Sequence, residues 1–327
     1  MKKLLVIRFS ALGDVAIMVP VLRLVAEKYP DWDFTMLSRG MCEPLFKGMP
    51  SNVHFVGADL KGRHHGRKGL EQLLKDIDYK SFDAVVDMHL VLRSFYLTMR
   101  MLFAGKRIAW IHKAHLSKWL IVHGLMSTRL ALVPTYKRYQ HAFNRLGFDV
   151  HIPNFTFSGN TVKREGIGIA PFAAHPGKIY PIEKMEQVVK ILSERLKGKE
   201  QIYLFGAGSK EKEILESWEQ KYKGVVSLVG KSDMAEEIEL MRRLRVVVSM
   251  DSGNMHLASI ADTRVISIWG ATHTALGFLG YGQSVNDCIQ KDLKCRPCSV
   301  FGKKKCKYGD YRCLDFTPEE IAEKILQ

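Results

Sequence analysis

Short apolar runs alternate with amphipathic stretches along the chain, and this alternation predicts strands that are each followed by a helix. The first apolar run covers residues 3–8, and apolar positions at helical spacing follow from Val15 to Ala26. Further strands are predicted at residues 34–37, 53–56 and 84–88, and a second helix at residues 92–103. Because these strands are short and largely apolar, we expect a parallel sheet with helices on both faces.

The same alternation begins again near residue 166. The predicted strands cover residues 166–170, 201–205, 225–229, 246–250 and 265–269, and the predicted helices cover residues 182–196, 210–222, 234–244 and 254–261. A capping box at Thr317-Pro318-Glu319-Glu320 predicts a last helix that runs through Ile325. Proline, asparagine, serine and glycine between residues 153 and 163 separate the two series. We therefore expect two α/β domains, over residues 1–158 and 159–327.

Ligands of such sheets bind outside the carboxyl ends of the strands. Four loops are therefore expected around one site between the domains, those after Arg8, Ala170, Phe205 and Met250. In the first loop, residues 10–14 open a helix, whose N-terminus offers free N–H groups and the positive end of the dipole. Asp14 is either a stabilising first-turn carboxylate or a general base there. The G-x-G-x-x-G pattern is absent from this turn, which weakens an interpretation as an NAD-dependent dehydrogenase.

The loop after Met250 reads D-S-G-N-M-H and leads from a predicted buried strand into a helix. Gly253 allows a ligand to approach the backbone closely, and Ser252 lies with the next N–H groups where a phosphate would bind. Because Asp251 and His256 lie at the same strand end, an anion site is favoured over an N-cap with an incidental histidine.

Two further loops carry weaker signals. Lys178, in the loop H-P-G-K-I-Y-P, either neutralises a phosphate or is simply solvated. The glycine turn F-G-A-G that precedes Glu211 suits nucleotide contact, but a lone G-x-G is weak support. Asp31-Trp32-Asp33 matches the D-x-D of metal-dependent glycosyltransferases. It lies in a helix-to-strand connection, away from the carboxyl ends of the strands, so we reject it as a metal site.

Five of the six cysteines follow residue 280, and four of them have the spacing C-x2-C-x7-C-x6-C: Cys295, Cys298, Cys306 and Cys313. This spacing allows either a structural zinc site or free thiols, since disulfides are rare in the cytosol. The interval between the pairs is short for a zinc ribbon, which favours free thiols.

Composition narrows the class of protein and of partner. The 327 residues are 46% hydrophobic, with a mean hydropathy of −0.08, and no run approaches the ~18 apolar residues of a membrane span. Arg8 interrupts the apolar start and no cleavage site follows, so we expect a cytoplasmic protein. Of the net charge of +15, residues 1–158 carry +11 (23 basic, 12 acidic) and residues 159–327 carry +4 (26 basic, 22 acidic).

The basic residues of the first half alternate with aromatic residues, including Trp110 and Trp119. This interleaving suits nucleic acid or a lipid interface. The basic half as a whole indicates either an anionic partner, which is nucleic acid, a lipid headgroup or a phosphorylated substrate, or a merely solubilising surface, and charge alone does not decide between the two. The sequence has no RNA-binding signature and no DNA-recognition helix pattern.

Taken together, the motifs resemble those of glycosyltransferase family 9, the ADP-heptose:lipopolysaccharide heptosyltransferases. The resemblance spans most of the chain and rests on residues 8–15, 87–94, 178–181, 205–208, 251–258 and 268–272 and on the late cysteines. It implies a GT-B fold, in which two Rossmann-like domains face a central cleft, with the acceptor on the N-terminal domain and the nucleotide-sugar on the C-terminal one. It also implies an inverting, metal-independent transfer of heptose from ADP-heptose to a lipopolysaccharide inner-core acceptor.

The resemblance implies roles for single residues. Asp14 becomes the general base, and Ser10, Gly13 and Arg93 lie on the acceptor side. The donor side comprises Lys178, Ser252, Gly253 and His256 at the diphosphate, Asp251 at the sugar hydroxyls and Glu211 at the ribose. The expected acceptor is a phosphorylated, lipid-linked glycan at the anionic inner face of the inner membrane, with no nucleic acid partner.

Two departures from the family pattern keep alternatives open. Ala173 and Ala174 occupy positions where the bacterial members often have threonine, and Tyr180 a position where they often have tryptophan. The same reaction with another nucleotide-sugar is therefore the nearest alternative. The alternative outside the enzymes is a non-catalytic basic protein that binds nucleic acid or membrane, which would bind polyanions with a steep dependence on salt.

Overall fold

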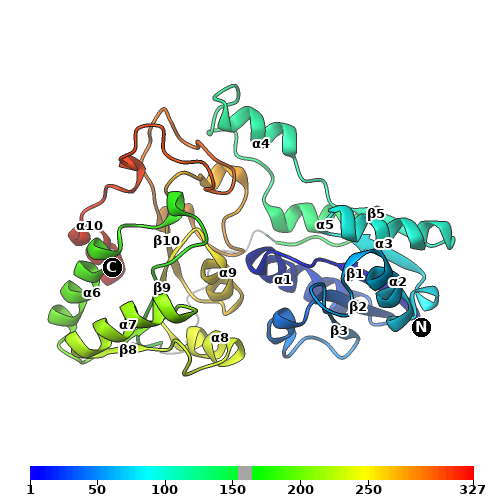
Figure 1. The fold of residues 1–327 in the computed structure, drawn as a ribbon, viewed down its shortest axis with the longest axis horizontal. Coiled ribbons are helices and arrows are strands. Elements are labelled where there is room, and N and C mark those ends of the chain that lie inside the picture. The colour runs from blue at the N-terminus through cyan, green and yellow to red at the C-terminus, as the bar shows by residue number, and fades with distance from the viewer. Residues whose placement is uncertain (154–163) are drawn as a thin grey trace. The chain divides into compact units, whose positions relative to one another are not determined.

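The structure is a computed structural model that describes residues 1–153 and 164–327 (Figure 1). The chain divides into two compact units. The first comprises Met1–Lys113 and Thr135–Pro153, and the second comprises Ala114–Pro134 and Asn154–Gln327. The domain boundary expected between residues 158 and 159 lies outside the described residues. Residues 114–134, assigned from the sequence to the first domain, cluster with the second unit.

The first unit contains a five-stranded parallel sheet with the strand order β3-β2-β1-β4-β5. Its strands are β1 (Lys2–Ile7), β2 (Trp32–Arg39), β3 (Val53–Ala58), β4 (Ala84–Asp87) and β5 (Arg107–Trp110). Its helices are α1 (Leu12–Lys28), α2 (Gly66–Asp76), α3 (Leu92–Phe103) and α5 (Thr135–Arg145). The sheet confirms the predicted parallel arrangement, because every strand pair in it is parallel.

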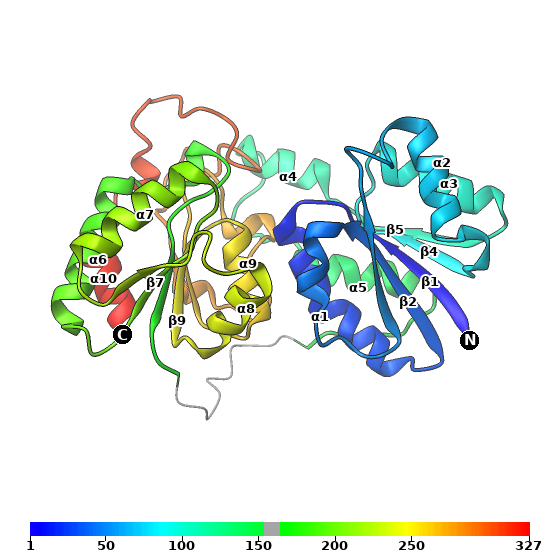
Figure 2. The same ribbon diagram turned by 60° about the horizontal axis from the view of Figure 1, so that its bottom comes forward.

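Helices cover both faces of this sheet, as the apolar strands require (Figure 2). Successive side chains of a strand point to opposite faces. Leu5 and Ile7 of β1 accordingly belong to a core cluster with side chains of α2 and α3. Leu4 and Val6 are equally buried and point to the other face, where α1 packs against α5.

The second unit contains a six-stranded sheet with the order β11-β10-β9-β6-β7-β8. Its strands are β6 (Ile167–Ala170), β7 (Ile202–Leu204), β8 (Val225–Ser227), β9 (Val246–Met250), β10 (Val265–Ile268) and β11 (Cys288–Ile289). Its helices are α4 (His115–Val122), α6 (Ile182–Leu196), α7 (Ser209–Lys221), α8 (Met234–Arg243), α9 (Gly253–Ile260) and α10 (Pro318–Leu326). Every pair of neighbouring strands is parallel, as predicted.

The last helix closes the core of the second unit. Thr317 accepts the N–H of Glu320 and Glu320 accepts the N–H of Thr317, so the predicted capping box is confirmed. Ile321 and Ile325 of α10 are fully buried and pack with α6. In the part of the chain that the structure describes, no helix is both long and apolar enough to span a membrane.

Candidate active site

The carboxyl edge of the first sheet brings together residues from two neighbouring strands. β1 and β4 are paired so that Ile7 lies beside Asp87. The residues that follow them, Arg8 and Met88, therefore leave the sheet side by side. The Arg8 guanidinium is buried and donates to the Met88 carbonyl oxygen.

Arg8 also fixes the residue that the sequence analysis proposed as the base. Its Nη2 atom lies 2.6 Å from Oδ2 of Asp14, whose side chain is 26% exposed. The same carboxylate oxygen accepts the N–H of Ala11 at 3.2 Å, in the first turn of α1. This carboxylate therefore stabilises the helix start, as one of the two sequence-based interpretations expects, and it is also partly exposed to solvent. Its role as a general base stays a prediction.

A half-buried histidine adjoins this pair. His89 lies after β4, and its Nε2 atom is 3.3 Å from the hydroxyl of Ser10. Burial, together with the charges of Arg8 and Lys113, lowers the pKa of His89 to about 3, so the ring is neutral at pH 7. A neutral imidazole donates one hydrogen bond and accepts another, whereas the charged ring can only donate.

Asp87 and Lys113 complete the polar edge of the first unit. Oδ1 of Asp87 accepts the N–H groups of His89 and Leu90, at 2.8 and 2.7 Å, and burial raises the pKa of this carboxyl. Lys113, three residues past β5, donates to the carbonyl of Leu90 at 3.0 Å. Burial and the nearby Arg8 charge lower the pKa of Lys113. Neither His89 nor Lys113 was predicted as a site residue: His89 lies within the family motif at residues 87–94, and Lys113 follows a strand that the pattern did not predict.

The other acceptor-side predictions differ in their surroundings. Gly13 is buried in the first turn of α1, next to Asp14. Arg93 is exposed on the first turn of α3 and forms no ion pair with any residue that the structure describes. Gly13 is therefore the chain neighbour of Asp14, Ser10 contacts His89, and the described residues show no contact between Arg93 and this group.

In the second unit, three neighbouring strands deliver the donor-side residues to one edge. Lys178 follows β6, Asp251 follows β9 and Thr272 follows β10. Nζ of Lys178 lies 2.8 Å from Oδ2 of Asp251, and the Thr272 hydroxyl donates to the same oxygen at 2.7 Å. The side chains of Lys178 and Asp251 are 15% and 5% exposed. The structure thus joins two predicted residues and adds Thr272, which the sequence analysis named only as part of a family motif.

The helix that starts behind this pair is α9. Ser252 is its N-cap residue and Gly253 its first residue, and His256 is buried one turn along. The hydroxyl of Ser252 lies 3.1 Å from that of Ser249 and does not cap the helix. The first N–H groups of α9 therefore have no side-chain cap from Ser252, which suits the predicted contact with a phosphate.

Glu211 has a local structural contact. It lies in the first turn of α7, and its Oε2 atom accepts the N–H of Ala207 at 2.7 Å. This hydrogen bond links the two ends of the glycine turn. Gly208 has the positive φ of 81° that the turn requires. The proposed contact of Glu211 with a ribose remains a prediction.

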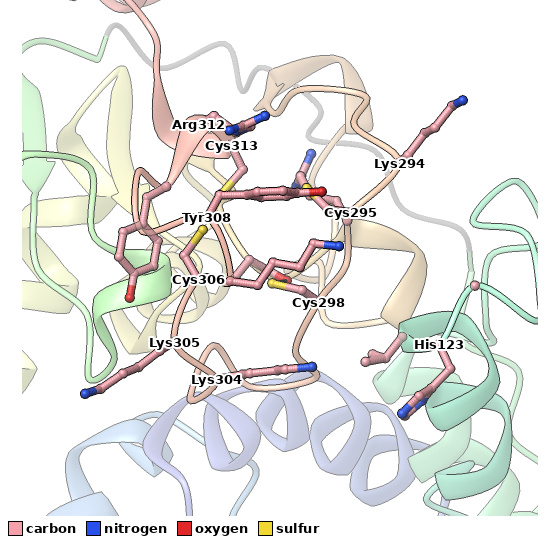
Figure 3. Close-up of a pocket in the computed structure, with 16 residues that line it drawn as sticks. His123, Lys294, Cys295, Cys298, Lys304, Lys305, Cys306, Tyr308, Arg312 and Cys313 are labelled. Atoms are coloured by element: carbon pink, nitrogen blue, oxygen red, sulfur yellow. Dashed lines mark hydrogen bonds between the residues drawn. The ribbon is translucent and has the colours of Figure 1, made fainter.

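The four late cysteines line one pocket of about 240 Å³ in the second unit (Figure 3). They are free thiols, and burial raises the pKa of Cys313 to about 11. Among residues 1–153 and 164–327, no three or more His, Cys, Asp or Glu side chains are arranged to hold a metal ion. The arrangement therefore gives no support to the zinc alternative.

Comparisons with known proteins agree with this architecture. The family model described as glycosyltransferase family 9 (heptosyltransferase) matches residues 70–311. The chain is 23% identical over 301 residues to lipopolysaccharide core heptosyltransferase OpsX of Haemophilus influenzae, covering 87% of this chain and 83% of that protein. It is 22% identical over 324 residues to lipooligosaccharide heptosyltransferase 2 of Campylobacter jejuni, covering 96% and 94%.

Solved structures of similar proteins share the fold. A family 9 glycosyl transferase from Veillonella parvula superposes with a TM-score of 0.73 at 18% identity, covering 99% of this chain and 96% of that one. The heptosyltransferase WaaC of E. coli with ADP-2-deoxy-2-fluoro heptose superposes with a TM-score of 0.70 at 17% identity, covering 99% of both chains. The predicted GT-B class of fold, with two parallel-sheet domains, is confirmed.

Proposed function

Because the chain belongs to glycosyltransferase family 9, the heptosyltransferase family, we propose that it transfers heptose from ADP-heptose to an acceptor of the lipopolysaccharide inner core. The curated relatives are named as heptosyltransferases of lipopolysaccharide or lipooligosaccharide, and WaaC was solved with an ADP-heptose analogue. The observation that carries the proposal is the Arg8–Asp14 pair, which holds a solvent-accessible carboxylate at the carboxyl edge of the first sheet.

Asp14 acts as the general base in this proposal. The acceptor hydroxyl oxygen attacks the anomeric carbon of heptose from the face opposite the diphosphate, and Asp14 takes the hydroxyl proton. The bond between the anomeric carbon and the diphosphate oxygen breaks, and ADP leaves with the electron pair, so the configuration is inverted. General-base catalysis of this kind is typically worth 10²–10⁴-fold in rate.

Lys178 and the start of α9 stabilise the leaving diphosphate. The ammonium group of Lys178 has three N–H donors, and its contact with Asp251 at 2.8 Å uses one of them. The others remain for phosphate oxygens, together with the N–H groups that follow Ser252. Cations and N–H donors aimed at developing charge often supply the largest part of catalysis, so the reaction would need no metal ion.

The remaining assignments follow from these roles. Residues 1–158 would bind the acceptor and residues 159–327 the nucleotide-sugar, with Asp251 at the sugar hydroxyls and Glu211 at the ribose. The acceptor would be lipid-linked and phosphorylated, and the protein would work as a peripheral protein at the cytoplasmic face of the inner membrane. The basic composition supports an anionic partner of this kind.

A donor screen tests the proposal. Thermal unfolding would be followed with ADP, UDP, GDP, CDP and NAD, each with and without EDTA. A ligand at 100 times its Kd adds about 2.7 kcal/mol of stability, which the screen detects. Stabilisation by ADP that survives EDTA is expected, followed by acceptor-dependent release of ADP from ADP-heptose.

Other outcomes would change the conclusion. Selective stabilisation by UDP, GDP or CDP would keep the reaction and overturn the donor. Loss of the ADP effect in EDTA would overturn metal independence. No stabilisation by any nucleotide, with no ADP release in the presence of acceptor, would favour the non-catalytic basic protein.

A further inference from the structure

One long stretch of the sequence has no acidic residue. Residues 88–148 contain no Asp or Glu and ten basic residues: Arg93, Arg100, Lys106, Arg107, Lys113, Lys118, Arg129, Lys137, Arg138 and Arg145. The stretch therefore accounts for two thirds of the net charge of +15. Ten of the fifteen exposed large hydrophobic side chains of the described residues also lie in it. Positive charge and exposed apolar side chains are thus concentrated in the same stretch of the sequence.

The middle of this stretch belongs to the second unit. We call residues 114–134, which include α4, the α4 segment. Its inward side chains hold it to that unit. The Nζ atom of Lys118 lies 4.2 Å from the ring centroid of Phe278, and Ile121 is 2% exposed. The N–H of Leu132 donates to the carbonyl of Ala275 at 2.8 Å.

The outward side chains of the α4 segment are large and apolar. The exposed fractions are 70% for Leu116, 50% for Trp119, 66% for Leu125, 65% for Leu130 and 48% for Val133. Leu116 and Trp119 lie three positions apart and therefore project from one side of α4, while Lys118 and Ile121 face the unit. A short segment with this many exposed large apolar side chains marks an interaction surface.

A basic pocket adjoins the same segment within the second unit. Val122, His123 and Gly124 line the pocket that holds the late cysteines, and Figure 3 shows His123 on the helix beside it. The other walls carry six cations and no carboxylate: Lys294, Arg296, Lys304, Lys305, Lys307 and Arg312. Lys294, Lys304 and Lys305 are exposed and form no ion pair with any described residue.

We propose that the α4 segment docks on a lipid bilayer that bears anionic headgroups. Its leucines and Trp119 enter the boundary between headgroups and acyl chains, and the exposed lysines of the adjacent pocket face the headgroup phosphates. Stable attachment of a surface helix takes apolar contact together with attraction of cations to the anionic surface, and this unit presents both. A second copy of the chain would bring the same positive charge to the surface and be repelled.

This surface deepens the proposed function, since a lipid-linked acceptor requires the enzyme to reach a membrane, and it rests on that proposal for its biological meaning. The test itself uses no transfer activity. The full chain would be sedimented with phosphatidylcholine vesicles and with vesicles in which a third of the lipid is phosphatidylglycerol. Binding is expected to the anionic vesicles, to weaken as salt is added, and to be much weaker with phosphatidylcholine alone.

Two variants separate the apolar from the ionic contribution. Leu116→Ser/Trp119→Ser should weaken binding to the anionic vesicles by roughly tenfold or more, because both side chains lose burial in the interface. Lys304→Gln/Lys305→Gln should lower binding to the anionic vesicles and leave the weak binding to phosphatidylcholine unchanged. Met41→Ser/Val285→Ser, which alters exposed apolar residues outside the stretch, is the matched control and should bind as the wild type does.

The outcomes are decisive in either direction. Circular dichroism and cooperative thermal unfolding confirm that the variants are folded. Vesicle binding unaffected by Leu116→Ser/Trp119→Ser would overturn the proposal. So would a dimer in solution that this variant dissociates, since the surface would then belong to a second copy, or equal binding to soluble heparin and vesicles. Failure of the donor screen with vesicle binding retained would overturn only the proposed function.

Discussion

Nη2 of Arg8 lies 2.6 Å from Oδ2 of Asp14, and the arginine is almost fully buried while the carboxylate is 26% exposed. Because Arg8 is buried, water does not compete with Asp14 for its guanidinium. The two charges therefore attract each other in a medium of low effective dielectric. The centroid of the Tyr139 ring lies 5.7 Å from the guanidinium carbon. This arrangement orients Oδ2 of Asp14 at the carboxyl edge of the first sheet, where the side chain is partly exposed to solvent.

Replacement of Asp14 by Asn tests its role as the base. Asp14→Asn should lower kcat by 10²–10⁴-fold, because an amide cannot accept the acceptor proton, and should leave ADP affinity unchanged. Steady-state transfer and calorimetric titration with ADP measure the two effects. Asp31→Asn, an exposed aspartate in a connection, is the control. Near-normal turnover by Asp14→Asn would remove Asp14 as the base.

Replacement of Arg8 tests whether it positions Asp14. Arg8→Met should lower kcat by about tenfold or more and leave the KM for donor nearly unchanged, because Asp14 is no longer oriented. In a double-mutant cycle, Arg8→Met should add little to the effect of Asp14→Asn, since both act on one group. Arg23→Met, which alters an exposed pair with Glu27, should change neither constant. Additive effects of Arg8→Met and Asp14→Asn would contradict the positioning role.

Lys178 should contribute both to donor binding and to folding stability. Lys178→Met should weaken ADP binding by roughly tenfold or more, because a charge-assisted contact with phosphate is lost. It also leaves Asp251 buried with Thr272 as its remaining partner, so the free energy of unfolding should fall by about 2–4 kcal/mol. Titration with ADP and urea unfolding measure these changes, and Lys190→Met on the exposed face of α6 is the control. Unchanged ADP affinity in Lys178→Met would assign the lysine to structure alone.

His89 should make the protein sensitive to acid. Its pKa is about 3 in the folded protein and ~6.5 in an unfolded chain, so the unfolded state binds more protons between these values. The contribution of neutral His89 is therefore complete above pH ~6.5 and is lost as the pH falls towards 3. At pH 5 the loss should be about 1–2 kcal/mol after allowance for its partial exposure.

Urea unfolding at pH 7 and pH 5 measures this loss. His89→Gln should show a smaller decrease in stability between the two values than the wild type, and His65→Gln, at an exposed position, should show the same decrease. Glu237, whose pKa burial raises to about 7, acts in the opposite sense in all three proteins. The comparison between variants therefore isolates His89, and identical decreases in His89→Gln and wild type would contradict its role.

Most elements of both units were predictable because local periodicity encodes them, but α2, α4, α5, β5 and β11 were not predicted. The helices at 92–103 and 182–196 and the strand at 246–250 have the bounds that the pattern predicts, since each carries a clear apolar face or run. The turn before α1 and the D-S-G-x-x-H stretch were also recognisable, because the residues of each motif are adjacent in sequence. By contrast, the buried face of α5 includes the polar side chains of Thr135, Arg138 and Gln140, and two of the four residues of β5 are exposed, so neither matches a simple apolar pattern.

Only the tertiary structure decided which of these residues meet. Strand order places β4 beside β1 and β9 between β6 and β10, so Arg8 comes to lie with Met88 and His89, and Asp251 with Lys178 and Thr272. It also showed that the α4 segment belongs to the second unit, although the residues on both sides of it in the sequence, 1–113 and 135–153, belong to the first. Contacts between distant residues depend on sheet order and on burial, which periodicity along one segment does not encode.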